Sequence, residues 1–175
     1  MNKVRKYKVI SNKNIDKHLF VIRLERNGFE FIPGQCVTIG IPKIGINREY
    51  SVCSGINDKF LEFLIEKVPN GVVSPLMRKL KKGSQVSIDG AFGLFTIKDL
   101  TKKYIFVYSG AGQAPFQSMI KSYPKLNYKL VEILDKIDKE AEYFICGDSI
   151  MINKNYDILR KNNVNGSNIH LESFY

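Results

Sequence analysis

The sequence is poor in the residues that build covalent and metal-bound frameworks. Only three cysteines occur among its 175 residues, and they are widely spaced at Cys36, Cys53 and Cys146. An odd, scattered set predicts neither a disulfide framework nor a zinc site. The only histidines are His18 and His170, which argues against a histidine-based metal cluster. We therefore expect reduced thiols and no metal site.

Long apolar runs are also missing from the sequence. No segment approaches the roughly 18 consecutive apolar residues that a membrane helix needs. The basic residues near the N-terminus are followed by alternating residues rather than by the apolar core of a signal peptide. These features predict a soluble, cytoplasmic protein without a membrane segment.

Acidic residues are scarce relative to basic ones. The chain has 17 Asp and Glu against 27 Lys and Arg, which gives a net charge of +10. A basic surface attracts anionic partners such as nucleic acid, a phosphorylated cofactor or an acidic protein. The lysines are spread along the chain, without the basic stripe and interleaved aromatic residues of a nucleic-acid surface. Nucleic-acid binding by a basic barrel therefore has little support, and it would show a strong dependence on salt.

The first half of the chain alternates between short apolar runs and turn signals. Asn27-Gly28 and Asn57-Asp58 are typical turn dipeptides. A helix is predicted over residues 73–80, with Ser74 as its N-cap and Pro75 at its first helical position. Six short strands separated by turns predict a small antiparallel barrel. The predicted strands cover residues 4–9, 18–25, 36–41, 49–53, 60–68 and 86–88.

The pattern changes after a polar linker at residues 98–103. Strands and helices now alternate, which predicts a parallel sheet. We therefore expect two domains, a barrel at residues 1–98 and a smaller α/β domain at residues 104–175. The predicted strands of the second domain cover residues 104–108, 143–146 and 169–171, and its predicted helices cover residues 113–122, 130–137 and 151–159.

Three residues of the predicted fourth strand could hold an anionic, aromatic ligand. Arg48 offers a fork to a pyrophosphate, Tyr50 offers a ring for stacking and Ser51 offers a hydroxyl. On a regular strand Arg48 and Tyr50 point to one face and Ser51 to the other. An Arg and a Tyr on an exposed sheet face are commonly plain surface residues, so this trio alone does not decide between the two readings.

Two glycine-containing turns lead into predicted helices. Gly71 precedes the helix at residue 73, where a phosphate would be favoured, although an ordinary turn also fits. Gly110 and Gly112 follow a strand and open a helix, with Pro115 at the place of the third glycine of a dinucleotide fingerprint. Such a turn either binds a diphosphate or is an ordinary tight turn without a ligand.

Two further stretches end strands of the second domain. Cys146-Gly147 lies at the carboxyl end of a predicted parallel strand, which is where α/β sheets bind ligands. A cysteine at this place either abuts a ligand or is buried in the core. The closing stretch from Glu172 to Tyr175 ends in aromatic residues that either fray or fold over an apolar ligand.

In their order and spacing these motifs resemble the ferredoxin/flavodoxin–NADP reductase family. The resemblance covers nearly the whole chain. The matching stretches are Arg48-x-Tyr50-Ser51, Leu61-Glu62-Phe63, Val68-Pro69-x-Gly71-x-x-Ser74-Pro75, Gly90-x-x-Gly93-x-Phe95, Gly110-x-Gly112-x-Ala114-Pro115-Phe116, Cys146-Gly147 and Glu172-x-Phe174.

The resemblance implies a six-stranded antiparallel FAD-binding barrel followed by a truncated parallel-sheet lobe that binds NADP(H) or NAD(H). By this likeness Arg48 contacts the FAD pyrophosphate, Tyr50 stacks on the isoalloxazine and Ser51 hydrogen-bonds near its N5. Cys146 and Glu172 would lie by the nicotinamide C4 and flavin N5, so the catalytic candidates are these two and Ser51. The other cofactor-binding candidates are Glu49, Leu64, Ile65, Glu66, Lys67, Gly71, Val72, Val73 and Ser74 for the FAD, Gly110, Ala111, Gly112 and Pro115 for the NADP diphosphate, and Phe174 and Tyr175 at the flavin.

The chain departs from the family pattern in its second half. Ala111 stands where the family usually has a threonine, and Gln113 stands where it usually has an aliphatic residue. Only 34 positions separate Gly112 from Cys146, an interval that in the family holds two more strands and the cluster that grips the 2′-phosphate and adenine. Residues 128–134 resemble the helix that normally precedes the Cys-Gly strand. We therefore expect a deletion and a parallel sheet of about three strands.

The resemblance implies an FAD-dependent reductase that transfers electrons between NAD(P)H and an acidic partner, ferredoxin or flavodoxin. Hydride transfer to flavin N5 would be followed by one-electron steps to the partner, and the basic charge would steer the acidic partner. The alternative is an FAD-binding electron-transfer module, or a decayed reductase, that no longer binds NADP productively.

Overall fold

The structure is a computed structural model that describes residues 5–42 and 44–174. Its N-terminal half is a six-stranded sheet with the strand order β4-β3-β6-β1-β2-β5, and every pair in it is antiparallel. The strands are β1 (Arg5–Asn14), β2 (Leu19–Glu25), β3 (Cys36–Gly40), β4 (Asn47–Ser51), β5 (Phe60–Glu66) and β6 (Gln85–Phe92). The predicted six-stranded antiparallel sheet is confirmed.

The strands of this sheet bury one face, as their alternating sequences predict. On β2 the side chains of Phe20, Ile22 and Leu24 are fully buried, while the residues between them are partly or fully exposed. Successive side chains of a strand point to opposite faces, so the apolar set fills the interior of the curled sheet. This set and its equivalents on the other strands form a single core cluster.

Strand β5 differs because its residues 61–65 are all buried. Leu61, Phe63 and Ile65 belong to the core of the antiparallel sheet. Glu62 and Leu64 point the other way and contact the C-terminal half of the chain. A strand that is buried on both faces carries a layer on each, so β5 is the strand at which the two halves meet.

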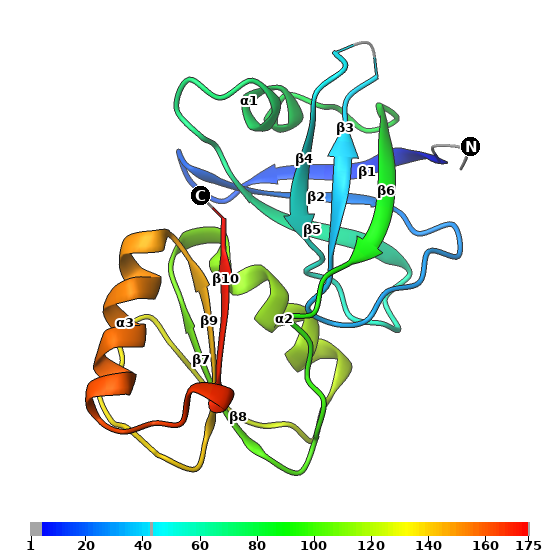
Figure 1. The fold of residues 1–175 in the computed structure, drawn as a ribbon. Coiled ribbons are helices and arrows are strands. Elements are labelled where there is room, and N and C mark those ends of the chain that lie inside the picture. The colour runs from blue at the N-terminus through cyan, green and yellow to red at the C-terminus, as the bar shows by residue number, and fades with distance from the viewer. Residues whose placement is uncertain (1–4, 43, 175) are drawn as a thin grey trace.

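The segment after β4 closes the antiparallel sheet toward β5. The backbone N–H of Cys53 donates to the carbonyl of Glu62 at 2.8 Å. The backbone N–H of Glu62 in turn donates to the Ser54 hydroxyl at 3.1 Å. These bonds connect the two edges of the sheet, which therefore has a barrel-like form (Figure 1).

Strand β1 is longer than the sequence indicates. The polar residues 12–14 are expected to end the first strand, but they pair with residues 20–22 of β2. The side-chain amide of Asn12 also has a structural use, since it donates to backbone carbonyls at the end of helix α1 (Val73–Arg78). Polar residues within a strand are tolerated where such partners satisfy them.

The C-terminal half contains a four-stranded sheet with the order β10-β9-β7-β8, and every pair in it is parallel. The strands are β7 (Lys103–Tyr108), β8 (Asn127–Val131), β9 (Glu142–Gly147) and β10 (Ile169–Ser173). The prediction of a parallel sheet is confirmed. The expected number of about three strands is wrong, because β8 adds a fourth.

Residues 130–137 do not form the predicted helix. Leu130 and Val131 end β8, which pairs with β7 so that Val107 lies opposite Val131. Residues 132–141 are an irregular connection to β9. The apolar spacing of so short a run is compatible with a helix and with a strand. Pairing with β7 decides between them, because the ladder satisfies the backbone groups and places Leu130 against the neighbouring core.

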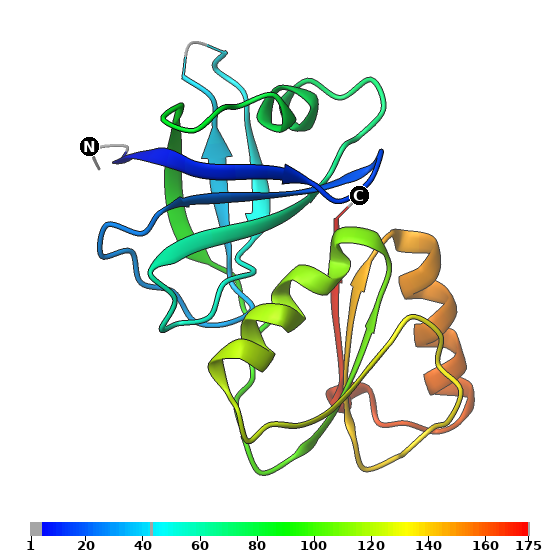
Figure 2. The same ribbon diagram turned by 180° about the vertical axis from the view of Figure 1, so that it is seen from behind.

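Helices cover both faces of the parallel sheet (Figures 1 and 2). The elements between the strands are η1 (Gly110–Gln113), α2 (Ala114–Ser122), α3 (Ser149–Lys161) and η2 (Gly166–Asn168). On one face Phe106 and Phe144 pack in a cluster with Phe116 of helix α2. On the other face Ile105 packs in a cluster with Ile152 of helix α3. None of the helices found in the described residues is both long and apolar enough to cross a membrane.

Helix α2 lies between the parallel sheet and the barrel in both views (Figures 1 and 2). The hydroxyl of Ser118 on α2 donates a 2.7 Å hydrogen bond to the carbonyl of Ser54 in the barrel. The same helix packs Phe116 and Met119 into the core under the parallel sheet. One helix therefore connects the packing of the two halves.

Candidate functional site

A cavity of about 430 Å³ lies between the barrel and the C-terminal end of the parallel sheet. Its wall is formed by β4, β5, the loop before α1, the η1 turn and the end of β10. A cavity of this size with both apolar and polar lining suits a small-molecule cofactor. The lining residues are Cys36, Arg48, Glu49, Tyr50, Ser51, Leu64, Ile65, Glu66, Val68, Gly71, Val72, Val73, Ser74, Ala111, Glu172, Ser173 and Phe174.

Most residues predicted to bind FAD are in this wall, together with Ser51 and Glu172 of the catalytic candidates. Lys67 is not among the lining residues, since its backbone N–H bonds to the His18 carbonyl and its side chain is exposed. Tyr175 lies outside the described residues. Cys36, Val68 and Ser173 also line the cavity, although none of them was predicted to bind a cofactor.

Strand β4 presents three of its residues to the cavity with different exposure. Arg48 is exposed, and its guanidinium donates to the adjacent Asn47 carbonyl at 2.7 Å. Among the described residues it takes part in no ion pair. Tyr50 is half-buried against the barrel core, and Ser51 is buried. A guanidinium without a carboxylate partner beside the cavity is available to an anionic group.

The loop before α1 and the first turn of α1 supply a further stretch of the wall. The hydroxyl of Ser74, the second residue of α1, accepts a 3.0 Å hydrogen bond from the Val68 backbone N–H. The predicted N-cap role of Ser74 is wrong, because Val72 precedes the helix and no side chain caps it. The hydroxyl instead holds the start of α1 to Val68, just after β5. A hydroxyl that accepts one bond keeps its own hydrogen for another acceptor.

Ser51 and Glu172 meet in the wall although 121 positions separate them in the chain. The Ser51 hydroxyl donates to the Glu172 carboxylate at 3.1 Å. Burial raises the pKa of Glu172 to about 7, the bond from Ser51 lowers it and the nearby charge of Glu49 raises it further. The Glu172 carboxyl group therefore changes protonation near neutral pH.

Cys146 lies behind this pair rather than in the cavity wall. Its side chain is fully buried in the cluster under the parallel sheet. On the neighbouring strand Glu172 is opposite Cys146 in the register. Burial, and secondarily the charge of Glu172, raises the pKa of the thiol well above its ordinary value. Cys146 is thus a neutral thiol beneath Glu172.

A second, smaller cavity of about 210 Å³ adjoins the first at the carboxyl ends of β7 and β9. Glu66, Ala111 and Phe174 line both cavities. The remaining wall of the second cavity comes from Ser109, Gly110, Gly147 and Asp148. The carboxyl edge of a parallel sheet is the usual place for a ligand in α/β folds. Sequence reasoning missed Asp148, although an Asp that begins a helix is a recognisable cap signal.

Asp148 has two structural partners in this edge. Its carboxylate accepts a 2.9 Å bond from the backbone N–H of Met151 and thereby caps α3. It also accepts a 2.7 Å bond from the Ser109 hydroxyl at the end of β7. These bonds lower its pKa, the one from Met151 most strongly. Asp148 is therefore a charged group that holds the ends of β7 and α3 together.

The glycine turn between β7 and α2 fits closely against both cavities. A Cβ at Gly112 would lie 2.1 Å from the Cys146 carbonyl, so no side chain fits there. Gly110 has a φ of +52°, and a Cβ on it would lie 2.7 Å from Glu66. Gly112 and Pro115 are buried and line neither cavity. The two glycines therefore set how closely the turn approaches β9 and β5.

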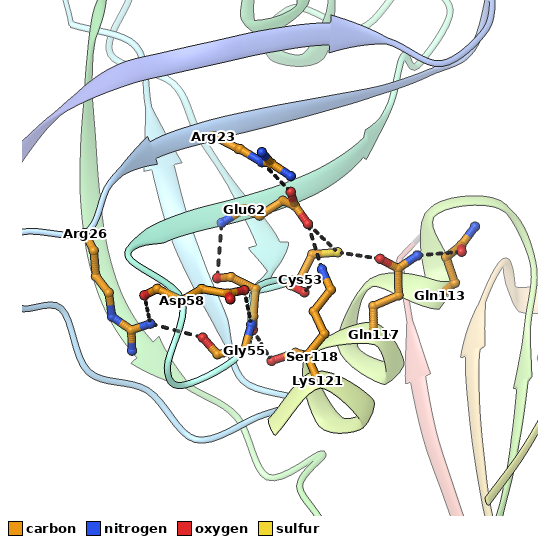
Figure 3. A network of polar contacts seen from close by, with 11 residues as sticks. Arg23, Arg26, Cys53, Gly55, Asp58, Glu62, Gln113, Gln117, Ser118 and Lys121 are labelled. Carbon is orange, nitrogen blue, oxygen red and sulfur yellow. Dashed lines mark hydrogen bonds and ion pairs between the residues drawn. The ribbon is translucent and has the colours of Figure 1, made fainter. Parts of the chain in front are cut away.

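A network of polar side chains joins α2 to the barrel beside the first cavity (Figure 3). The carboxylate of Glu62 accepts bonds from Lys121 at 2.8 Å and from Arg23 at 2.6 Å. Lys121 also donates to the Cys53 carbonyl at 3.1 Å. Burial alone would raise the pKa of Glu62, but the hydrogen bonds from Lys121 and Arg23 outweigh it and lower the pKa. The network holds α2, and with it the glycine turn, against β5.

No group of three or more His, Cys, Asp or Glu side chains within residues 5–42 and 44–174 is arranged to hold a metal ion.

Comparison with known proteins decides the family. The sequence profile of a family described as "oxidoreductase FAD-binding domain" matches residues 2–97, which is more than half of the chain. The chain belongs to this family. It therefore contains an FAD-binding domain, and the first cavity, whose wall is mostly built from residues 36–74, lies in the matched region.

Curated relatives extend the match in different ways. The chain is 34% identical over 96 residues to the toluate 1,2-dioxygenase electron transfer component of Pseudomonas putida, covering 54% of this chain and 29% of that protein. It is 32% identical over 165 residues to the ferredoxin–NADP reductase of Pseudomonas aeruginosa, covering 82% of this chain and 63% of that protein. The chain spans less than two thirds of the length of these relatives. The resemblance to the ferredoxin–NADP reductase family is confirmed.

A solved structure agrees with the observed fold over its full length. A ferredoxin–NADP⁺ reductase from Neisseria gonorrhoeae, solved with bound FAD and NADP, superposes with a TM-score of 0.84. The sequences are 18% identical, and the superposition covers 100% of both chains. The likeness confirms the fold, a barrel-like antiparallel sheet followed by a parallel sheet with helices.

Proposed function

We propose that this chain is a reductase that uses bound FAD to take electrons from a nicotinamide nucleotide and pass them to a one-electron redox protein. The observation that carries this proposal is the meeting of two cavities. The first lies in the FAD-binding domain, the second lies at the carboxyl edge of the parallel sheet, and they share Glu66, Ala111 and Phe174. Two ligands bound there would lie in contact.

The first cavity offers groups that suit the parts of an FAD molecule. The guanidinium of Arg48, which forms no ion pair within the described part of the chain, suits a pyrophosphate, and the half-buried ring of Tyr50 offers a stacking surface. The N-terminal end of α1, from Val72 to Ser74, offers backbone N–H groups and a hydroxyl along the same wall. When bound, FAD supplies a ring that accepts two electrons together and releases them singly.

Ser51 and Glu172 provide a proton-handling pair in the wall of the cavity. A carboxyl group with a pKa of about 7 can release or accept a proton at neutral pH with little cost in free energy. The Ser51 hydroxyl touches Glu172 and faces the cavity, so it can relay a proton between that carboxyl and a bound ring. The buried Cys146 lies opposite Glu172 on the neighbouring strand.

The electron acceptor is proposed from charge. The net charge of +10 favours an acidic protein partner through electrostatic steering. Ferredoxin or flavodoxin fits this description. The relatives named as electron transfer components of dioxygenases indicate a second kind of acceptor, an oxygenase component.

The test of the proposed function is anaerobic reduction of the flavin. The purified protein, saturated with FAD, is mixed with NADH or with NADPH, and the loss of flavin absorbance is followed by stopped flow. Bleaching by either nucleotide, followed by reduction of an added acidic ferredoxin, is the expected result. A flavin that stays oxidised with both nucleotides would refute the proposal.

One observation favours a second candidate function, an electron-transfer module that binds FAD without a nucleotide. The second cavity is lined by the carboxylates of Glu66 and Asp148 and, within the described part of the chain, by no Lys or Arg. Carboxylates repel a diphosphate unless a cation or backbone donors compensate them. Calorimetric titration with both nucleotides separates the two candidates, because micromolar binding of either one excludes the module.

A further inference from the structure

Two side chains meet beyond the second cavity, at the carboxyl ends of β7 and β8. These strands pair in parallel with Val107 opposite Val131, so the next residues, Tyr108 and Glu132, are neighbours. The Tyr108 hydroxyl donates to the Glu132 carboxylate at 3.1 Å, and Glu132 is exposed. Tyr108 packs against the cluster under α2. The bond therefore holds the Glu132 carboxylate on the face of the sheet from which α2 begins.

The glycine turn begins directly after Tyr108 and leads into α2. Glu132 stands 20 positions after Gly112, at the end of the next strand along the chain. In parallel α/β sheets a dinucleotide lies with its diphosphate on such a turn and its adenosine ribose at the end of the following strand. Glu132 thus occupies the place that would contact the ribose.

A carboxylate at this place distinguishes two ribose groups by simple electrostatics. Its two oxygens accept hydrogen bonds from a 2′-hydroxyl and a 3′-hydroxyl. A 2′-phosphate at the same distance would place two anionic groups in contact, which is unfavourable without a cation. The residue therefore favours a ribose with a free 2′-hydroxyl.

Within residues 5–42 and 44–174, no Lys, Arg or His forms an ion pair with Glu132. Lys129 on β8 is engaged at 2.8 Å by Asp135. The residue after Glu132 is Ile133, whose side chain is 80% exposed and offers an apolar surface. The next basic residue along the chain is Lys136, four positions beyond Glu132. An exposed apolar side chain beside a carboxylate suits a flat adenine next to its ribose.

We propose that Glu132 is the specificity-determining residue of this edge and that it selects NADH over NADPH as the electron donor. This inference rests on the proposed reductase function, because it names the nucleotide that the second cavity would receive. Tyr108 acts as a positioning residue that holds the Glu132 carboxylate at the end of β8.

The preference is measured at the adenosine end alone, so that hydride transfer does not enter the measurement. The FAD-loaded full chain is titrated by calorimetry with ADP-ribose and with 2′-phospho-ADP-ribose. The variants are Glu132→Gln, Lys136→Gln and a matched control, Glu140→Gln. Glu140 is exposed and lies just before β9, at the amino ends of the parallel strands, whereas the glycine turn lies at their carboxyl ends.

The expected result is that ADP-ribose binds the unmodified chain about 10-fold or more tightly than its 2′-phospho analogue, as one hydrogen bond to a charged group implies. Glu132→Gln should reduce this ratio about 10-fold, since the neutral amide accepts weaker bonds and no longer repels phosphate. Glu140→Gln and Lys136→Gln should leave the preference for ADP-ribose in place. Equal binding, a preference for the 2′-phospho analogue or an unchanged ratio in Glu132→Gln would each overturn the inference. Failure of both analogues to bind with a Kd below about 1 mM would overturn it as well.

Failure of this inference is distinguishable from failure of the proposed function. Bleaching of the flavin by NADPH as fast as by NADH would overturn the role of Glu132 and leave the reductase function standing. Selective binding of ADP-ribose without bleaching by either nucleotide would support the role of Glu132 and refute the reductase.

Discussion

The hydroxyl of Ser51 on β4 donates a 3.1 Å hydrogen bond to the carboxylate of Glu172 on β10. The two residues come from the two different sheets of the molecule. Their bond therefore forms only when the parallel sheet is docked on the barrel, and its geometry reports on that docking. The raised pKa of Glu172 has the same origin, because burial between the two sheets is its largest cause.

Replacing Glu172 by glutamine should change how stability depends on pH. Because burial raises the folded-state pKa from 4.5 to about 7, the folded chain binds more protons than the unfolded chain between these values. Its free energy of unfolding therefore falls as the pH rises from 4.5 to 7 and stays low above pH 7. Glu172→Gln removes this loss and should be more stable than the unmodified chain at pH 8, by at most about 3 kcal/mol. Urea unfolding of the flavin-free protein at pH 5 and pH 8 measures the difference.

The matched control for this prediction is Glu140→Gln, which neutralises an exposed carboxylate. Its stability relative to the unmodified chain should hardly change between pH 5 and pH 8. A Glu172→Gln variant with the same relative stability at both pH values would contradict the raised pKa.

Replacing Lys121 by methionine should weaken the attachment of α2 to the barrel. The Glu62 carboxylate is nearly buried and would keep Arg23 as its only remaining cation in Figure 3. Loss of one partner of a buried carboxylate costs about 1–3 kcal/mol. Urea unfolding of Lys121→Met at pH 7 tests this value. The same substitution at Lys129, whose pair with Asp135 is exposed, should cost less than about 1 kcal/mol. Equal losses for the two variants would argue against the network as the link between the halves.

Replacing Arg48 by alanine should weaken FAD binding without unfolding the chain. The side chain is exposed and bonds only to a neighbouring carbonyl among the described contacts, so its removal leaves the barrel core intact. Loss of charge-assisted bonds to a pyrophosphate should lower the affinity for FAD about 10- to 100-fold. Fluorescence titration of the flavin-free protein with FAD measures it. Arg5→Ala, at an exposed position on β1, serves as the control and should keep the affinity of the unmodified chain.

Replacing Gly112 by alanine should strain the junction between η1 and β9. The new Cβ would lie 2.1 Å from the Cys146 carbonyl, so backbone has to move. Overpacking of this kind costs about 1–3 kcal/mol. The thermal midpoint should fall accordingly, and ordinary stability would show that the turn can shift freely. Gly166→Ala is the control, since the nearest atom to its Cβ would be a flexible Arg160 nitrogen at 3.4 Å.

The strands of the barrel could be predicted from local sequence patterns, whereas most of the cavity wall could be predicted only from the resemblance to a known family. Alternation of apolar residues sets the buried face of β2, and turn dipeptides separate the strands. Arg48, Tyr50 and Ser51 alone do not distinguish a ligand site from a plain sheet surface, and they point to a flavin only together with the other motifs in their order and spacing. Ser74 is the instructive exception, since its position beside Pro75 indicates a cap while its hydroxyl bonds back to Val68.

The strand β8 could not be predicted, because its sequence does not distinguish strand from helix. Leu130, Val131, Ile133 and Leu134 have helical spacing, and the choice depends on the free edge of β7, which no local pattern encodes. The bond from Lys121 to Glu62 was missed for a similar reason. Lys121 is one of 27 basic residues, and nothing in its neighbourhood marks it as the partner of a carboxylate 59 positions away.

Helix α2 follows the parallel sheet in the sequence but touches the barrel through Ser118 and Lys121. The natural unit of exchange between related reductases is therefore not the stretch that ends at the linker. A barrel transferred to another reductase would need an α2 whose surface matches it. A parallel sheet transferred without its barrel would keep the α2 side chains that normally contact that barrel. Chimeras should be joined so that β5 and α2 come from the same parent.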